Sequence, residues 1–193
     1  ILVLQGMVEA IEKEIREWSR EYLEQVNPQF ANMPACPYAA KSWAEDRVGF
    51  CYKTCPSYQD LTTVISTWDD KYDLVVLIDL DYTKDHESYY EYLDAMNEGI
   101  AQGIFIEKDI WLMAFHPDDE PNDLLQTDGV GENLDMDVDL DYAMVFVQRL
   151  SKLHEASMKL EQTDYYKEYS KQHGLEEMLR IRESYYRRLK DGS

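Results

Sequence analysis

Leu74-Val75-Val76-Leu77-Ile78 is an unbroken apolar run, and Ile110-Trp111-Leu112-Met113-Ala114-Phe115 is a second one. Short, nearly continuous apolar runs predict β-strands that are covered on both faces. A further strand is predicted at residues 48–53, and helical patterns at residues 58–68 and 87–101 separate the three strands. Strands that alternate with helices in this way are joined by right-handed crossovers and run parallel. We therefore expect an α/β fold with a small, mostly parallel central sheet of about three or four strands, flanked by helices.

Helices are also predicted before and after this sheet. Apolar residues recur at helical spacing in residues 8–26, which predicts an amphipathic helix that ends before Pro28. Residues 144–193 are expected to form C-terminal helices as an extension of the fold. Residues 1–6 resemble the remnant of a cleaved purification tag, so residues 7–193 are expected to form a single α/β domain.

The composition is that of one acidic globular domain. Of the 193 residues, 45% are hydrophobic, which is enough for a buried core, and the net charge is −20. This charge argues against binding to nucleic acid, which needs clustered Lys and Arg. No apolar run reaches the roughly 18 residues of a membrane span, and no signal peptide is recognisable. With three cysteines, an odd number, the sequence predicts a reduced, cytoplasmic protein without a membrane partner.

Polar side chains follow the predicted strands. Asp79 and Asp81 come after one strand, and His116, Asp118 and Asp119 come after the next. Because the carboxyl ends of parallel strands share one edge of a sheet, we expect these side chains to converge there. Imidazole and carboxylate groups bind metals, so His116 with Asp79, Asp81 and Asp119 is a hypothetical site for a divalent metal. The alternative is a histidine that is hydrogen-bonded to the backbone of the following turn.

Cys36 precedes Pro37, a residue that favours the first position of a helix. Residues 37–45 are predicted to form that helix with Cys36 as its N-cap, and the helix dipole is then expected to lower the pKa of the thiol. This helix is expected to run antiparallel to the first strand, which follows it. Its N-terminus, with Cys36, should then lie at the same edge of the sheet as the carboxyl end of that strand. Cys36 is thus a candidate nucleophile or redox thiol, with His116 as its base and Asp118 as the orienting carboxylate. The alternative is a buried, inert cysteine.

Two motifs, Cys36-Pro37-Tyr38-Ala39 and Ala114-Phe115-His116-Pro117-Asp118, resemble those of the bacterial family called domain of unknown function 1415. Members of that family have Cys-Pro-Phe-Ala after an N-terminal helix and Ser-Phe-His-Pro-Asp-Tyr further along. The similarity covers about residues 10–157 and includes the segments 74–78, 89–97 and 146–156. An Arg-Ser-Pro-Tyr-Pro stretch of the family is replaced here by an acidic loop. The resemblance implies that Cys36 and His116 belong to one recurring pattern, and it implies no activity.

Two functions are expected from these features. The first is a small enzyme or ligand-binding protein with a Cys/His/Asp pocket at the carboxyl edge of the sheet. The alternative is a non-catalytic acidic protein that binds a basic partner or mimics nucleic acid. Residues 118–141 would be its binding surface, since they contain ten acidic residues and no Lys or Arg. The corresponding partners are a small molecule in the first case and a basic protein in the second.

Overall fold

A computed structural model describes residues 2–54, 59–81, 85–105, 108–117 and 142–165, together with residues 180, 183–184, 186–187 and 190–191. Its helices are α1 (Leu2–Trp18), α2 (Ala39–Ala44), α3 (Gln59–Ser66), α4 (His86–Ala101) and α5 (Leu150–Glu161). Its strands are β1 (Val26–Asn27), β2 (Met33–Pro34), β3 (Val48–Lys53), β4 (Leu74–Asp79), β5 (Ile110–Phe115) and β6 (Ala143–Arg149). A helix able to cross a lipid bilayer is not found among the described residues.

Four strands form the central sheet in the order β3-β4-β6-β5. β3 and β4 are parallel, whereas β6 runs antiparallel to both of its neighbours, β4 and β5. β3, β4 and β5 therefore point in one direction. Their carboxyl ends share one edge of the sheet, called here the carboxyl edge, and their amino ends share the opposite, amino edge. The predicted α/β fold with a small sheet is confirmed.

β6 corrects the prediction that residues 144–193 form C-terminal helices. Ala143–Arg149 is a strand, and the helix α5 begins only at Leu150. Residues 143–147 are buried in the middle of the sheet, with helices on both sides. Such a two-sided environment favours the β-branched and aromatic side chains of Val145-Phe146-Val147 in an extended conformation. The strand therefore forms although its apolar run continues directly into a helical pattern.

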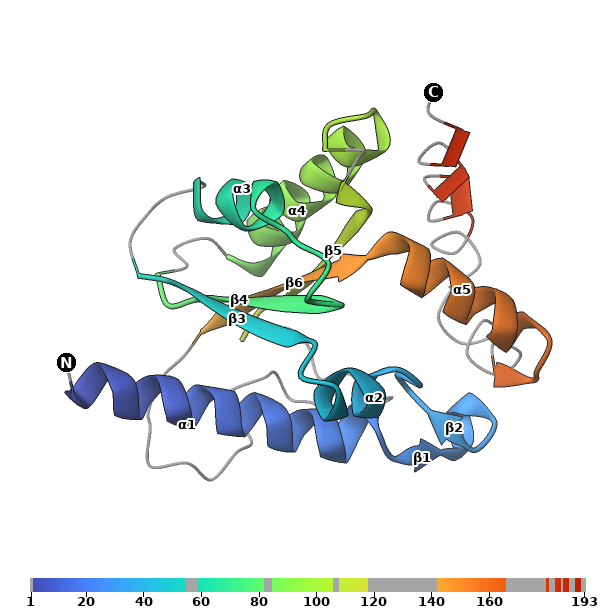
Figure 1. The fold of residues 1–193 in the computed structure, drawn as a ribbon, viewed down its shortest axis with the longest axis horizontal. Coiled ribbons are helices and arrows are strands. Elements are labelled where there is room, and N and C mark those ends of the chain that lie inside the picture. Colours follow the sequence, from blue (N-terminus) through green and yellow to red (C-terminus); the bar gives the residue numbers. More distant parts are fainter. Residues whose placement is uncertain are drawn as a thin grey trace.

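Helices cover both faces of the sheet, with α3 and α4 on one side and α1 on the other (Figure 1). Successive residues of a strand point to opposite faces, so each strand contributes to two cores. The core beneath α3 and α4 contains Val75, Leu77, Val145 and Val147 among others. The core beneath α1 contains Val76, Ile78, Met144 and Phe146, against which Ile11, Ile15 and Trp18 of α1 pack.

The amino-terminal region differs from the prediction in its boundaries. α1 begins at Leu2, within residues 1–6, and a π-helical turn, Ser19–Leu23, continues it. α2 has only six residues, and its N-cap is Tyr38 rather than Cys36. The indole Nε1 of Trp43 in α2 donates to Ser19 Oγ at 2.9 Å, which ties α2 to the end of α1. That residues 1–6 are a tag remnant stays a prediction.

Side chains of α4 cover the outer edge of β5. The amide nitrogen of Asn97 donates to Leu112 O at 2.9 Å, and its amide oxygen accepts from the Leu112 N–H at 3.0 Å. The Tyr90 hydroxyl donates to Ala114 O at 3.2 Å. Unpaired backbone groups at a sheet edge are a template for pairing with other chains. These contacts satisfy such groups within the molecule.

Candidate functional site

A row of residues crosses the sheet at its carboxyl edge. Lys53 ends β3 and is the register partner of Asp79, which ends β4 and is in turn the partner of Ala143. His116 directly follows β5 and extends the row beyond Ala143. Because alanine is small, it leaves space between the side chains on its two sides. The structure thus places Asp79 and His116 at one edge, as their positions after parallel strands predict.

Charged and aromatic side chains pack together around this row. Lys53 Nζ lies 2.7 Å from Asp79 Oδ2, and both side chains are largely buried. Asp79 Oδ1 accepts from the Asp81 backbone N–H at 3.0 Å. The ring of Tyr89, from α4, lies 5.5 Å from the ring of His116, and His116 is only 1% exposed. These five residues, Lys53, Asp79, Asp81, Tyr89 and His116, are called the carboxyl-edge cluster.

Two oxygen atoms of the carboxyl-edge cluster are buried without a hydrogen-bond partner. They are the hydroxyl oxygen of Tyr89 and Oδ2 of Asp81. Each buried polar group left in this state costs roughly 1–3 kcal/mol of stability. Burial, followed by the charge of Asp79, raises the pKa of Tyr89 above its ordinary value, so this phenol stays protonated at neutral pH.

The predicted divalent-metal site is not assembled by the described residues. No three His, Cys, Asp or Glu side chains among them are placed to hold a metal ion. The ammonium group of Lys53 already neutralises Asp79, which leaves less charge at this position to attract a cation. Asp119, the fourth predicted ligand, lies outside the described residues. So does Asp118, whose catalytic role stays a prediction, and so does the acidic stretch of residues 118–141.

Cys36 does not join His116, contrary to the prediction. It lines a pocket together with Val48 and Leu74, the first residues of β3 and β4, and so lies at the amino edge. The six residues of β4 separate the two edges by roughly 16 Å, at about 3.3 Å per residue. The reason is the length of α2, which spans only about 9 Å and cannot carry Cys36 along the sheet. A Cys36–His116 catalytic pair is therefore not formed.

The environment of Cys36 also opposes the predicted activation of its thiol. Burial raises the pKa of this thiol, and hydrogen bonds from the backbone N–H groups of Tyr38 and Ala39 offset only part of that effect. The negative charge of Glu24 raises it further. Cys36 as a whole residue is partly exposed, but its thiol lies against protein atoms that displace water. The sulfur is therefore a neutral part of the pocket wall at neutral pH.

The pocket that contains Cys36 is enclosed by α1, α2, α5 and the face of the sheet that packs against α1. We call it the amino-edge pocket, and its volume is about 90 Å³. Its inner wall is apolar and includes Ile15, Trp18, Val76 and Phe146, all of them buried. The indole Nε1 of Trp18 is buried without a hydrogen-bond partner, as is the amide nitrogen Nε2 of Gln148, another wall residue.

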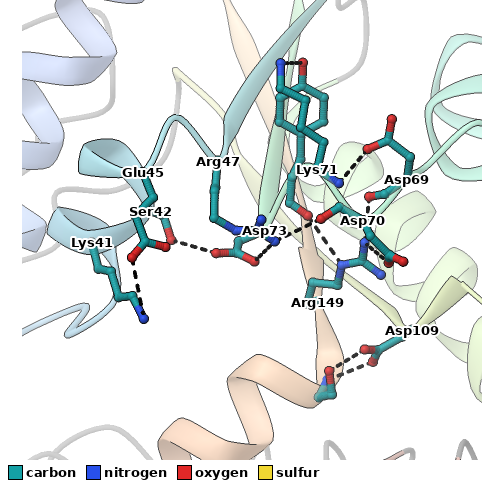
Figure 2. Close-up of polar contacts among 12 residues, drawn as sticks. Lys41, Ser42, Glu45, Arg47, Asp69, Asp70, Lys71, Asp73, Asp109 and Arg149 are labelled. Atoms are coloured by element: carbon teal, nitrogen blue, oxygen red, sulfur yellow. Dashed lines mark hydrogen bonds and ion pairs between the residues drawn. The ribbon is translucent and has the colours of Figure 1, made fainter.

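Charged residues form the less buried, outer end of the amino-edge pocket, and Figure 2 shows two of them, Asp73 and Arg149, with their partners. Asp73 accepts hydrogen bonds from Arg47 at 2.8 Å and from Ser42 at 3.3 Å, and the Arg47 guanidinium lowers the pKa of Asp73. Arg149 donates to the carboxylate of Asp70 at 2.9 Å. Asp73 and Arg149, two of the three charged residues of the lining, are thus held in ion pairs, which fix their side chains.

Sequence reasoning missed most of the amino-edge pocket. Phe146, Gln148 and Arg149 reach it because β6 is a strand, whereas the sequence pattern predicts a helix there. A usable signal was the run Val145-Phe146-Val147, whose β-branched and aromatic residues favour a strand. Lys152 and Leu153 come to the pocket with the first turn of α5.

Comparison of the chain with family models, with curated proteins and with solved structures gives no match. The resemblance to the domain of unknown function 1415 therefore stays a prediction.

Proposed function

We propose that this protein binds a small, mainly apolar molecule in the amino-edge pocket. The observation that carries the proposal is the pocket itself, a concave site with an apolar inner wall and a few polar groups at one end. Binding sites for small molecules commonly have this construction. Its volume of about 90 Å³ holds on the order of six water-sized groups, at roughly 10–15 Å³ each.

Two features of the pocket wall support the proposal. The side chain of Gln148 carries a buried N–H group without a partner, and a bound molecule with an oxygen atom can accept its hydrogen bond once the amide rotates toward the pocket. Filling the pocket also gives the side chains of Ile15, Val76 and Phe146 contacts that they lack on that side, and each buried CH₂ group of a ligand contributes about 0.8 kcal/mol.

NMR with an apolar probe tests the proposal. 1-Hexanol is titrated into the protein while the four indole N–H signals are recorded. We expect shifts for Trp18 and Trp43, which line the pocket, and none for Trp68 and Trp111, which do not. Equal shifts of all four signals, or none at all, would contradict a specific site.

Two neighbouring alanines of α2 provide a variant and its matched control. Ala39 lines the pocket and Ala40 is exposed outside it. Ala39→Leu places a larger side chain in the cavity and should weaken 1-hexanol binding at least about tenfold, because overpacking costs roughly 1–3 kcal/mol. Ala40→Leu makes the same change in size and should bind like the wild type. Unchanged binding to Ala39→Leu would show that the probe binds elsewhere.

A further inference from the structure

We infer that the natural ligand of the amino-edge pocket is an anionic amphiphile: a short apolar tail in the pocket and a carboxylate-like head at Lys152. This inference rests on the proposed function, because it names the class of molecule that the same pocket takes. It comes from the order of polar and apolar residues along the pocket and from the charges at its outer end.

The pocket changes from apolar to charged along the strands that line it. Val76 and Phe146 are register partners in the middle of the sheet, and both are buried. Two residues toward the amino edge, Leu74 is paired with Gln148, and the charged Arg149 follows. The change from apolar to polar wall therefore takes about 7 Å, at about 3.3 Å per residue. A ligand that matches this wall has a short tail and one polar end.

The charges at the outer end decide the sign of that polar head. Asp73 is neutralised by Arg47, and Arg149 by Asp70. Among the described lining residues, Lys152 is then the charged side chain without an ion pair. The Cys36 thiol adds no negative charge, since burial raises its pKa. A small anion therefore meets a net positive charge here, in a chain whose net charge is −20.

The position of Lys152 is set by the fold, because the start of α5 is anchored. The Leu150 N–H donates to Asp109 O at 3.1 Å. The Ser151 N–H donates to Asp109 Oδ1 at 2.8 Å, a contact drawn at Asp109 in Figure 2. Lys152 is exposed, and its charge acts on the Asp73 carboxylate without forming an ion pair, so its ammonium can meet a ligand head without breaking a salt bridge. Its effect is then that of an exposed charge pair, which is modest but measurable.

Three probes with one tail and different heads test the inference. Hexanoate, 1-hexanol and hexylamine carry negative, neutral and positive heads at pH 7. We expect hexanoate to bind roughly two to five times more tightly than 1-hexanol, and hexylamine to bind most weakly, as a single exposed charge pair predicts. Dissociation constants come from the Trp18 and Trp43 indole shifts, measured at low and high salt.

Variants of two lysines on α5 separate the possible results. Lys152→Gln should remove the preference for hexanoate over 1-hexanol, and Lys152→Glu should reverse it. Lys159→Gln changes the charge of the same helix away from the pocket and should keep the preference. If 1-hexanol binds as tightly as hexanoate in the wild type, the anionic head is refuted while the pocket stands. If none of the probes binds, the proposed function itself is refuted.

Discussion

Replacing Asn97 with leucine removes the polar contacts that close the outer edge of β5. Asn97 is 7% exposed, and its amide satisfies both the N–H and the C=O of Leu112, at 3.0 and 2.9 Å. Leucine has a similar size, so Asn97→Leu leaves little cavity, and the loss is confined to these two hydrogen bonds. Both backbone groups then stay buried without a partner.

The expected loss of stability follows from those two groups. Each buried backbone group without a partner costs roughly 1–3 kcal/mol, so the variant should lose about 2–6 kcal/mol. A domain of this kind is stable by roughly 5–15 kcal/mol in total, so a loss in this range is large. Asn97→Leu should therefore unfold at a much lower urea concentration than the wild type.

Urea unfolding followed by circular dichroism measures this loss. Tyr90→Phe removes a single bond to Ala114 O at the same edge and should cost only about 0.5–1.5 kcal/mol. Ala95→Leu adds a leucine on the exposed side of α4 and should change stability by less than about 0.5 kcal/mol. If Asn97→Leu were no less stable than Ala95→Leu, the edge groups of β5 would be satisfied by solvent, and the reasoning would fail.

Three further predictions concern buried titratable groups. Burial raises the pKa of Glu14, and the hydrogen bond from the Tyr142 hydroxyl (2.7 Å) offsets only part of this rise. The folded protein therefore favours the protonated form of Glu14. The stability that this form contributes is complete below about pH 4.5 and is lost as the pH rises through the raised pKa. Glu14→Gln should thus be more stable than the wild type at pH 7, by on the order of 1 kcal/mol, with the difference vanishing in thermal unfolding at pH 4. Cys36 should react with iodoacetamide at pH 7 more slowly than a free thiol, because burial raises its pKa. Mass spectrometry measures the rate of alkylation at Cys36, and a rate faster than that of a free thiol would contradict the prediction. Tyr89→Phe removes a hydroxyl without a partner and should raise the free energy of unfolding by about 1 kcal/mol, whereas a loss would reveal a hydrogen bond at that oxygen.

The strands that sequence reasoning found are those with a clear start and end. β3 and β5 have the predicted bounds, and β4 differs by one residue, Asp79. Short apolar runs between polar turns determine such strands locally. β6 has no such boundary, because Arg149 is followed at once by the helix that starts at Leu150, without Gly or Pro between them. Only burial between β4 and β5, a long-range effect, makes residues 143–149 a strand.

The part of the candidate site that depends only on the direction of the strands, the carboxyl edge, was predictable from the sequence. Asp79 and His116 share an edge because both follow parallel strands. The position of Cys36 depends on how far a six-residue helix reaches, and the state of its thiol depends on burial, neither of which the motif encodes. The amino-edge pocket combines α1, α2, β6 and α5, so it exists only after the whole chain has folded.

The place of β6 also determines when the chain can fold during its synthesis. Of the strands that the structure describes, β6 is the last to leave the ribosome, yet it lies between β4 and β5 and provides all of their contact within the sheet. Until residue 149 has emerged, β4 and β5 cannot join, and each exposes a strand edge on which another nascent chain could pair. The contact of Tyr142 with Glu14, 128 residues earlier, must likewise wait. Ribosome-bound chains that end before β6 should therefore be protease-sensitive, and protection should appear in one step once α5 is complete.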